Sequence, residues 1–320
     1  MAFKIIHGSN GSAIDIHADA IELSLASPVL RGAGTEYLFA GDLNLEQGAD
    51  GLILGHAGEL LFFAQVIPRQ GDLKMQTRKV YQQVLEHIGH FLILRIWNYI
   101  PAINAMEGGV ERYRAFCVGR AEAFGTHFQT NAMEPSYPAG SAVGIPDDSM
   151  VIFGVACRGK EKARFFENSR QIPAYQYPAR YGPRPPSFSR ASLFVGEESQ
   201  AVYISGTASV IGHETHDPLQ VDKQLQTTYS LLESLFGGLN RESAGSLPSD
   251  WIQRANGRLY LRRASDATVA EAWLRKHFPL AEGSWRIVEA DLCRSDLVAE
   301  MELSFHPVAQ SITRAFSFHA

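Results

Sequence analysis

The sequence predicts an α+β protein in which a few helices cover one face of mixed β-sheets. First, short apolar or alternating runs, separated by Gly, Asp and Asn, outnumber the stretches with helical spacing. Second, the second half has the order β-β-α-β-α-β-β, and its two helices suit one face of a mixed sheet. Third, the first half also runs from strands into helices, so the two halves are candidates for related units, although no residue-level repeat is visible.

In the first half, apolar residues at helical spacing predict helices at about 77–95 and 110–124. Residues 128–150 are rich in Pro, Gly and small polar residues, and we expect a long loop there. The expected strands of this half are 36–40, 51–55, 60–67 and 150–157.

The second half contains an unusual segment, residues 173–190, with the sequence PAYQYPARYGPRPPSFSR. A loop of this length inside a compact protein is usually functional or disordered, and its rigid prolines and aromatic rings favour function. The expected strands around it are 164–167, 191–195, 201–205, 258–262, 285–292 and 298–305, and the expected helices are 218–236 and 267–277.

Composition excludes several classes of protein. Hydrophobic residues make up 45% and charged residues 20% of the chain, which is typical of a globular protein. The formal net charge of −5 leaves no basic excess for coating nucleic acid. The N-terminal apolar run is too short for a signal peptide, and the longest apolar stretch, 91–100, is too short to span a bilayer. We therefore expect a soluble cytoplasmic protein with neither a membrane nor a nucleic-acid partner.

Standard catalytic and metal motifs are missing from the sequence. There is no GxGxxG, P-loop, GxSxG or HExxH motif, and the three cysteines form no CxxC pair. His87 with His90, and His213 with His216, have a spacing that can hold a metal, but neither pair has a third ligand nearby. We expect no metal site.

Two arginines are candidates for binding an anion. Arg184 lies in the proline-stiffened loop, where a guanidinium is preorganised for a planar anion such as a carboxylate. Arg120 follows an apolar turn and a glycine at the end of the second expected helix, so it can point inward. A solvated arginine is the alternative interpretation at both positions.

Glu300 is the candidate acid. In the last strand Val298, Glu300 and Glu302 face one way, while Ala299 and its apolar partners face the core. An exposed strand face explains this pattern. The alternative is a carboxyl group in a cleft, whose pKa is raised by partial desolvation into the range of a general acid.

Six segments in order, RIWNY, YRAFCVGRAEA, YPARYGPRPPSFSRA, VYISGTASVIGHETH, LYLRR and DLCRSDLVAEMEL, resemble the chorismatase family of chorismate-cleaving enzymes. The resemblance covers residues 90–305, and the first 80 or so residues carry little of it. The second half also resembles the RidA/YjgF fold, with an SGT strand end, a long helix and a closing strand ending in E-x-E. The resemblance implies two RidA/YjgF-like units, 1–150 and 151–320, with the closing catalytic strand in the second and a site where they face each other.

The resemblance implies that pyruvate is removed from chorismate. Glu300 matches the family's acid, which protonates the enolpyruvyl methylene. Arg184 and Tyr181 match a substrate-anchoring loop, and Tyr175 and Arg120 are further candidates for binding the substrate dianion. This chemistry requires no cofactor and no metal. The chain is expected to be a monomer or a homotrimer, because RidA relatives are trimers and two units in one chain can satisfy their interfaces internally.

Two positions separate the branches of the family. The branch that hydrolyses chorismate to a dihydroxycyclohexadiene acid has alanine at both, whereas this chain has Gly206 and Cys293, which resembles the 3-hydroxybenzoate-forming branch. Gly206 would give the ring room to tilt, and Cys293 would relay a proton or shape the pocket. The alternatives are a mixture of 3- and 4-hydroxybenzoate, the diene diol, a RidA-like imine deaminase, or a ligand-binding protein without catalysis.

Overall fold

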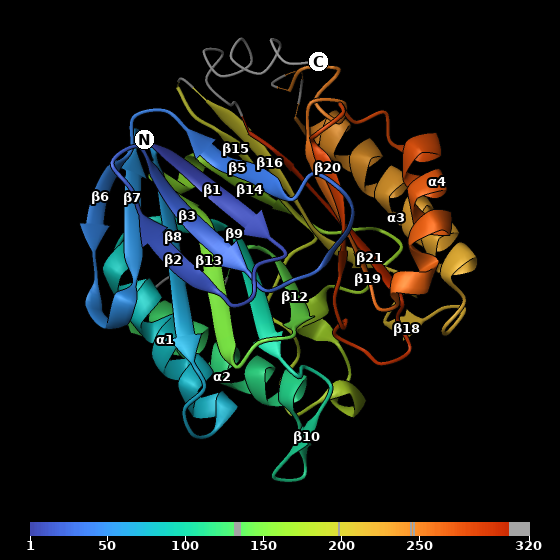
Figure 1. Ribbon diagram of the computed structural model, residues 1–320, viewed down its shortest axis with the longest axis horizontal. Helices are drawn as coiled ribbons and strands as arrows, with labels where there is room; N and C mark the ends of the chain where they lie inside the picture. The colour runs from blue at the N-terminus through green and yellow to red at the C-terminus, as the bar shows by residue number, and fades with distance from the viewer. Residues whose placement is uncertain (131–135, 198, 244, 246, 307–320) are drawn as a thin grey trace.

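Two large mixed sheets organise the computed structural model (Figure 1), which describes residues 1–130, 136–197, 199–243, 245 and 247–306. The first sheet has the strand order β12-β9-β13-β8-β7-β6, and the second has the order β14-β15-β16-β21-β19-β20-β4. Figure 1 shows α1 and α2 on one side of the molecule and α3 and α4 on the other, with the sheets between them.

The first sheet consists of β6 (Asn44–Gln47), β7 (Ile53–Ala57), β8 (Leu60–Pro68), β9 (Leu92–Pro101), β12 (Ala139–Ile145) and β13 (Ser149–Cys157). Helices α1 (Leu73–Ile88) and α2 (Arg112–Thr130) cover one face of it, where Val80 and Val84 share a core with Phe63 and Ile152. The hairpin of β10 (Met106–Glu107) and β11 (Val110–Glu111) precedes α2.

The second sheet consists of β4 (Val29–Gly32), β14 (Ala163–Phe166), β15 (Ala191–Val195), β16 (Gln200–Ala208), β19 (Asn256–Leu261), β20 (Trp285–Glu289) and β21 (Ala299–Phe305). Helices α3 (Val221–Glu242) and α4 (Ala267–His277) cover one face, where Leu232 packs in one core with Met301 and Leu303. A hairpin of β17 (Val210–Ile211) and β18 (Glu214–Thr215) follows β16. The predicted α+β class, with two mixed sheets each covered by helices on one face, is confirmed.

The N-terminal residues form a third sheet that was not predicted apart from its last strand. Its order is β2 (Ala13–Ile16), β3 (Ala20–Leu25), β1 (Ala2–His7) and β5 (Thr35–Ala40). Residues of this sheet, such as Phe3 and Leu23, share a core with Trp97 of the first sheet and Tyr203 of the second. The N-terminal sheet therefore lies against the uncovered faces of both large sheets.

The helix expected at 77–95 ends earlier than predicted. It stops at Ile88, and Gly89 adopts a φ of +59°, which breaks the helix before β9 begins at Leu92. Arg95 is therefore a strand residue, in a strand paired on both sides and almost entirely buried. Such a strand is a nearly continuous apolar run that periodicity cannot distinguish from helix.

The long loop expected at 128–150 is also wrong in part, since α2 continues to Thr130 and residues 139–145 form β12. This strand pairs in parallel with β9, and all seven of its residues are buried. Its small residues, AGSAVGI, carry little strand signal because close packing rather than side-chain propensity holds it in place. Residues 131–135 lie outside the described part of the chain.

The loop at 173–190 is confirmed, since it contains only short 3₁₀ turns at Ala174–Gln176 and Ala179–Tyr181. The expected boundary at 150 falls inside β13, whose whole length pairs within the first sheet. The division of the chain into two domains stays a prediction. Within the described residues, no helix combines the length and the apolar character needed to cross a bilayer.

Candidate active site

A cavity of about 250 Å³ opens where the start of α2 meets the proline-rich loop and the ends of β16 and β21. Its walls therefore come from both halves of the chain. It is lined by Glu111, Tyr113, Arg114, Cys117, Gln171, Tyr177, Tyr181, Arg184, Pro186, Phe188, Arg190, Gly206, Ala208, Val210, Cys293, Arg294, Ser295, Asp296, Leu297 and Glu300. Four arginines and one buried carboxyl group on a partly apolar wall suit a small, multiply anionic ligand.

Glu300 lies on the wall of this cavity, on β21, and is only 4% exposed. Among the described residues, none donates a hydrogen bond to its carboxyl group. Burial, and then the negative charge of Glu302, raise the pKa of Glu300 to about 8, although Arg95 and Arg190 act in the opposite direction. The cleft interpretation therefore replaces the exposed-strand interpretation, and this carboxyl group keeps its proton at neutral pH.

Gly206 lies directly against the Glu300 carboxyl group. The pairing of β16 with β21 shifts register between Ile204 and Thr207, and this bulge brings the Gly206 backbone close to the acid. A Cβ at position 206 would overlap with Glu300 Oε1 and would lie 2.7 Å from Glu300 Cδ and 2.9 Å from Ser141 Oγ. Gly206 therefore makes room for the acid itself rather than only for a ligand.

Cys293 lines the same cavity, four residues after β20 ends at Glu289. Burial, and then the nearby Glu300, raise the pKa of its thiol to about 12. A thiol in this state is neutral at physiological pH, so it acts as a small apolar wall and a weak donor, and not as a thiolate nucleophile.

Tyr181 and Arg184, in the proline-rich loop at residues 173–190, both line the cavity. Their predicted role in binding the substrate stays a prediction. The Arg184 side chain is exposed and forms no hydrogen bond or ion pair within the described residues, so its charge is available to a ligand. The Tyr181 ring is held by the Arg294 guanidinium, 4.3 Å from the ring centroid, and its hydroxyl lies 3.1 Å from His213 Nδ1.

Arg120 lies deeper, in a cavity of about 30 Å³ that shares Glu300, Gly206 and Cys293 with the larger one. It is 1% exposed, and its Nε and Nη2 atoms have no hydrogen-bond partner within the described ranges. Its burial agrees with the inward orientation expected for Arg120. A buried guanidinium with two nitrogen atoms that make no hydrogen bond is suited to a ligand anion, and this binding role stays a prediction.

Tyr175 is the one predicted site residue that the structure places away from both cavities. Its ring packs on Tyr137 at a centroid distance of 5.2 Å. The 3₁₀ turn at Ala174–Gln176 directs Tyr175 toward this contact, whereas Tyr177, two residues later, lines the cavity.

Sequence reasoning missed Arg190 and Arg294. Arg190 is 4% exposed and donates to the Tyr177 hydroxyl at 2.8 Å, while its Nε has no hydrogen bond within the described residues and lies 3.9 Å from Glu167 Oε2. Arg294 lines the cavity in the segment before β21, and the sequence assigned it no role. The signal available for Arg190 was its place at the end of the loop directly before a strand, but a single arginine there has many structural explanations.

Comparison with known proteins identifies the family. A family model described as "Chorismatase FkbO/Hyg5-like, N-terminal" matches residues 38–156. A 3-hydroxybenzoate synthase from Streptomyces hygroscopicus is 36% identical over 272 residues, which is 82% of this chain and 78% of that protein. The chain belongs to the chorismatase family. A chorismatase from Streptomyces rapamycinicus is 28% identical over 79% of this chain and 76% of its own length.

One solved structure agrees with this assignment at the level of the fold. A chorismatase crystal structure matches 95% of this chain and 92% of its own chain, with a TM-score of 0.81 and 23% sequence identity. A Rid-family protein from Yersinia pestis matches 45% of this chain and 99% of its own, with a TM-score of 0.34 and 14% identity. The predicted resemblance to the chorismatases is confirmed.

Proposed function

We propose that this chorismatase-family protein converts chorismate to 3-hydroxybenzoate and pyruvate, with Glu300 as the acid. The observation that carries the proposal is a buried carboxyl group on the wall of an arginine-lined cavity, which receives no hydrogen bond from the described residues and whose pKa is raised to about 8. A carboxylic acid that stays neutral at pH 7 can deliver a proton to a weak carbon base such as an enol ether.

The proposed reaction balances without water. Glu300 protonates the enolpyruvyl methylene, which becomes the methyl group of pyruvate and leaves an oxocarbenium-like carbon. The ring hydroxyl then attacks the oxocarbenium carbon and loses its proton, which gives a cyclic ketal. The bond between this oxygen and its ring carbon breaks as the neighbouring ring carbon loses its proton, so that the ring aromatises, and the resulting hemiketal separates into pyruvate and the phenol. One of the two released protons ends on the phenol oxygen, and the other returns to the Glu300 carboxylate. The two products together contain the atoms of chorismate.

The anionic groups of chorismate require cationic contacts. Arg184 and Arg294 lie at the loop side of the cavity, Arg190 is buried in its wall, and Arg120 lies beyond Glu300 in the smaller cavity. Arginines in two cavities that share Glu300 in their lining suit a substrate with two separate carboxylates. We propose that Arg120 and Arg184 contact the substrate, with Tyr181 as part of the same wall.

Gly206 and Cys293 are the proposed determinants of the product. Neither residue supplies a base, because Gly206 has no side chain and the Cys293 thiol is neutral. Their role is to leave the acid and the ring in a geometry in which the ring hydroxyl, rather than water, captures the cation.

A single assay tests the function. Purified protein is incubated with chorismate, and the products are resolved by chromatography against standards for 3-hydroxybenzoate, 4-hydroxybenzoate and the dihydroxycyclohexadiene acid. We expect pyruvate and 3-hydroxybenzoate in equal amounts. A mixture of hydroxybenzoates, or the diol, would assign the protein to another product branch of the chorismatase family. The absence of pyruvate would overturn the proposed function, and ammonia release from a 2-imino acid would then favour an imine deaminase.

The pH dependence follows from the acid. Because the protonated form of Glu300 is the active one and its pKa is about 8, kcat/KM should be flat near neutral pH and fall as the pH rises through about 8. An ordinary exposed glutamate would already be ionised at neutral pH. A profile whose alkaline limb lies near pH 5 would contradict this assignment.

Arg184→Ala is expected to raise KM for chorismate by roughly 10- to 100-fold with a smaller change in kcat, because a charge-assisted hydrogen bond contributes about 1.5–3 kcal/mol. The exposed side chain has no partner to lose within the described chain, so the thermal unfolding temperature should stay unchanged. Arg241→Ala, on the exposed end of α3, is the control for removing a positive charge. Equal KM values for Arg184→Ala and Arg241→Ala would show that Arg184 does not bind chorismate.

A further inference from the structure

Two glutamates stand two residues apart on the same face of β21, and their surroundings are opposite. Both are almost fully buried, with Glu300 4% and Glu302 2% exposed. Glu300 receives no hydrogen bond from the described residues. The Glu302 carboxylate accepts hydrogen bonds from Arg95 Nη2 at 2.6 Å, Trp97 Nε1 at 2.8 Å, Arg258 Nη1 at 2.8 Å, Tyr260 Oη at 3.2 Å and Ser141 Oγ at 2.5 Å.

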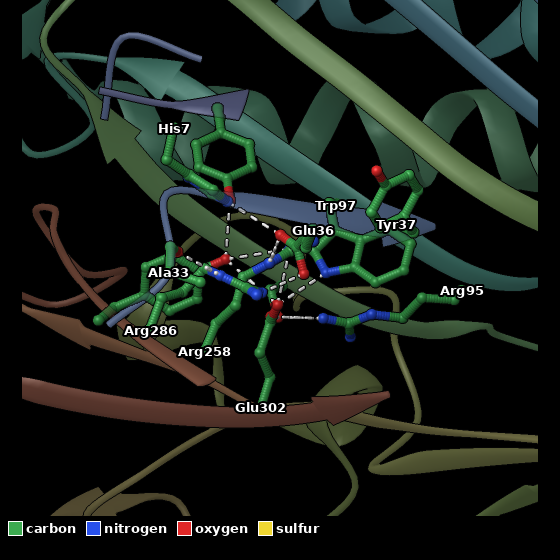
Figure 2. A network of polar contacts seen from close by, with 12 residues as sticks. His7, Ala33, Glu36, Tyr37, Arg95, Trp97, Arg258, Arg286 and Glu302 are labelled. Atoms are coloured by element: carbon green, nitrogen blue, oxygen red, sulfur yellow. Dashed lines mark hydrogen bonds and ion pairs between the residues drawn. The ribbon is translucent and has the colours of Figure 1, made fainter. Parts of the chain in front are cut away.

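The donors to Glu302 come from both large sheets. Figure 2 shows Arg95 and Trp97 of β9 pointing at the Glu302 carboxylate from one side and Arg258 of β19 from another. Arg258 continues the network to Glu36 of the N-terminal sheet, at 2.6 Å, and Glu36 is also paired with Arg286. Glu302 is therefore the point at which the polar groups between the two sheets meet.

Ser141 shows how this arrangement affects the acid. It lines the small cavity together with Glu300, but its one hydroxyl proton is donated to Glu302. Its oxygen accepts from Arg95 Nη2 at 2.6 Å and from the Gly206 backbone N–H at 2.9 Å. This hydroxyl, which lines the same small cavity as Glu300, therefore donates its proton to Glu302 and not to Glu300.

We propose that Glu302 is a positioning residue for catalysis: it draws the hydrogen-bond donors between the two sheets onto itself and leaves the Glu300 carboxyl group without one. A carboxylate that accepts several hydrogen bonds is stabilised as an anion and is a poor acid, whereas one without donors keeps its proton. The negative charge of Glu302, two residues away, acts in the same direction. The inference rests on the proposed function, since Glu300 is the acid in it.

Several charged and titratable groups surround Glu300 and can affect its protonation in the pH experiment described below. They are Glu302 on its own strand, Tyr260 opposite it on β19, Arg95 on β9, Arg190 at the end of the loop, Cys293 in the preceding segment and Arg120 on α2. Arg95 and Arg190 stabilise the anion of Glu300, while Glu302 opposes it. Substitutions at Glu302 and Arg95 are therefore expected to have effects of opposite sign.

The experiment is the pH profile of kcat/KM for chorismate in the full-length protein. In Glu302→Gln the hydrogen-bond donors no longer face an anion, and the repulsion between the negative charges of residues 302 and 300 disappears. The alkaline limb should therefore move down by about one pH unit. This shift lowers kcat/KM about fivefold near pH 8 and leaves it close to the wild-type value near pH 6. In Arg95→Gln the limb should move upward. Arg95→Lys keeps the charge and should keep the wild-type limb.

Glu36→Gln is the matched control, because it removes a buried carboxylate from the same network at a position that contacts Arg258 and Arg286 but not the cavity. Two results would indicate a purely structural role for Glu302 and overturn the proposal. In the first, Glu302→Gln lowers kcat/KM at every pH and leaves the alkaline limb in place. In the second, Glu302→Gln and Glu36→Gln move the alkaline limb equally. If Glu302→Gln does not fold, the pH profile of Arg95→Gln tests the proposal instead. An alkaline limb of Arg95→Gln that stays in place or moves down rejects the proposal. Absence of pyruvate release in the wild-type protein would instead reject the proposed function.

Discussion

Glu300→Gln is expected to lower kcat for pyruvate release by about 10²- to 10⁴-fold, which is the usual contribution of a general acid. The amide has the shape of the carboxyl group but cannot donate its proton to carbon. Chorismate should still bind, because the arginines that face the cavity are untouched. Pyruvate release measures the loss, and isothermal titration calorimetry measures binding.

Glu86→Gln is the control for this substitution, since Glu86 is exposed on α1 and has no hydrogen bond or ion pair within the described residues. It should behave as the wild type. Turnover of Glu300→Gln within a few-fold of the wild type would show that another group supplies the proton. Loss of binding together with turnover would point to a substrate contact at Glu300 and not to an acid.

The same variant has a second consequence, for stability. The fold raises the pKa of Glu300 from an ordinary 4.5 to about 8, so the folded state holds a proton that the unfolded chain releases. Stability from this group is complete below pH 4.5 and is lost as the pH rises toward 8. Glu300→Gln removes that loss, so its thermal unfolding temperature relative to the wild type should increase between pH 5 and pH 8.

Gly206→Ala is expected to reduce kcat by about 100-fold, the order of effect that a displacement of roughly 1 Å of a catalytic group produces. The added methyl group would occupy the position of Glu300 Oε1 and crowd Ser141 Oγ at 2.9 Å, so the acid must turn away from its place. Combined with Cys293→Ala, it should also shift the product from 3-hydroxybenzoate toward the dihydroxycyclohexadiene acid. Chromatography of the products checks both effects.

Gly238→Ala, in α3, is the matched control because an added Cβ there meets no atom within 4 Å. Its rate and product should equal those of the wild type, and its stability should rise slightly, since alanine is the better helix former. If Gly206→Ala turns over chorismate at the wild-type rate to the same product, the contact between position 206 and the acid has no role in catalysis.

The sequence by itself determined the fold class, most strands and helices of the second half, and the family. Local patterns suffice there because α3 and α4 have clear apolar stripes, and because the chorismatase segments are specific in order and content. It also placed Glu300, Gly206, Cys293, Tyr181 and Arg184 in one site, and all five line one cavity. The catalytic and binding roles assigned to them stay predictions.

Sequence patterns gave wrong predictions where packing between distant segments of the chain determines the local structure. β9 is held by pairing with β12 and β13, and β12 by pairing with β9, so residues 92–95 were mistaken for the end of a helix and β12 for loop. Tyr175 and Tyr177 are neighbours of the same type in one loop, yet only the second faces the cavity. The direction of a loop side chain depends on turn geometry and contacts that a sequence does not display.

Only the tertiary structure shows that the two similar carboxyl groups of β21 have opposite surroundings. Glu300 and Glu302 share a strand face and are equivalent as a pattern. Donors from residues 95, 97, 141 and 258 converge on Glu302 and leave Glu300 with none among the described residues. Because protonation depends on burial and on donors brought together from distant parts of the chain, the difference between the two glutamates arises only when the two sheets pack together.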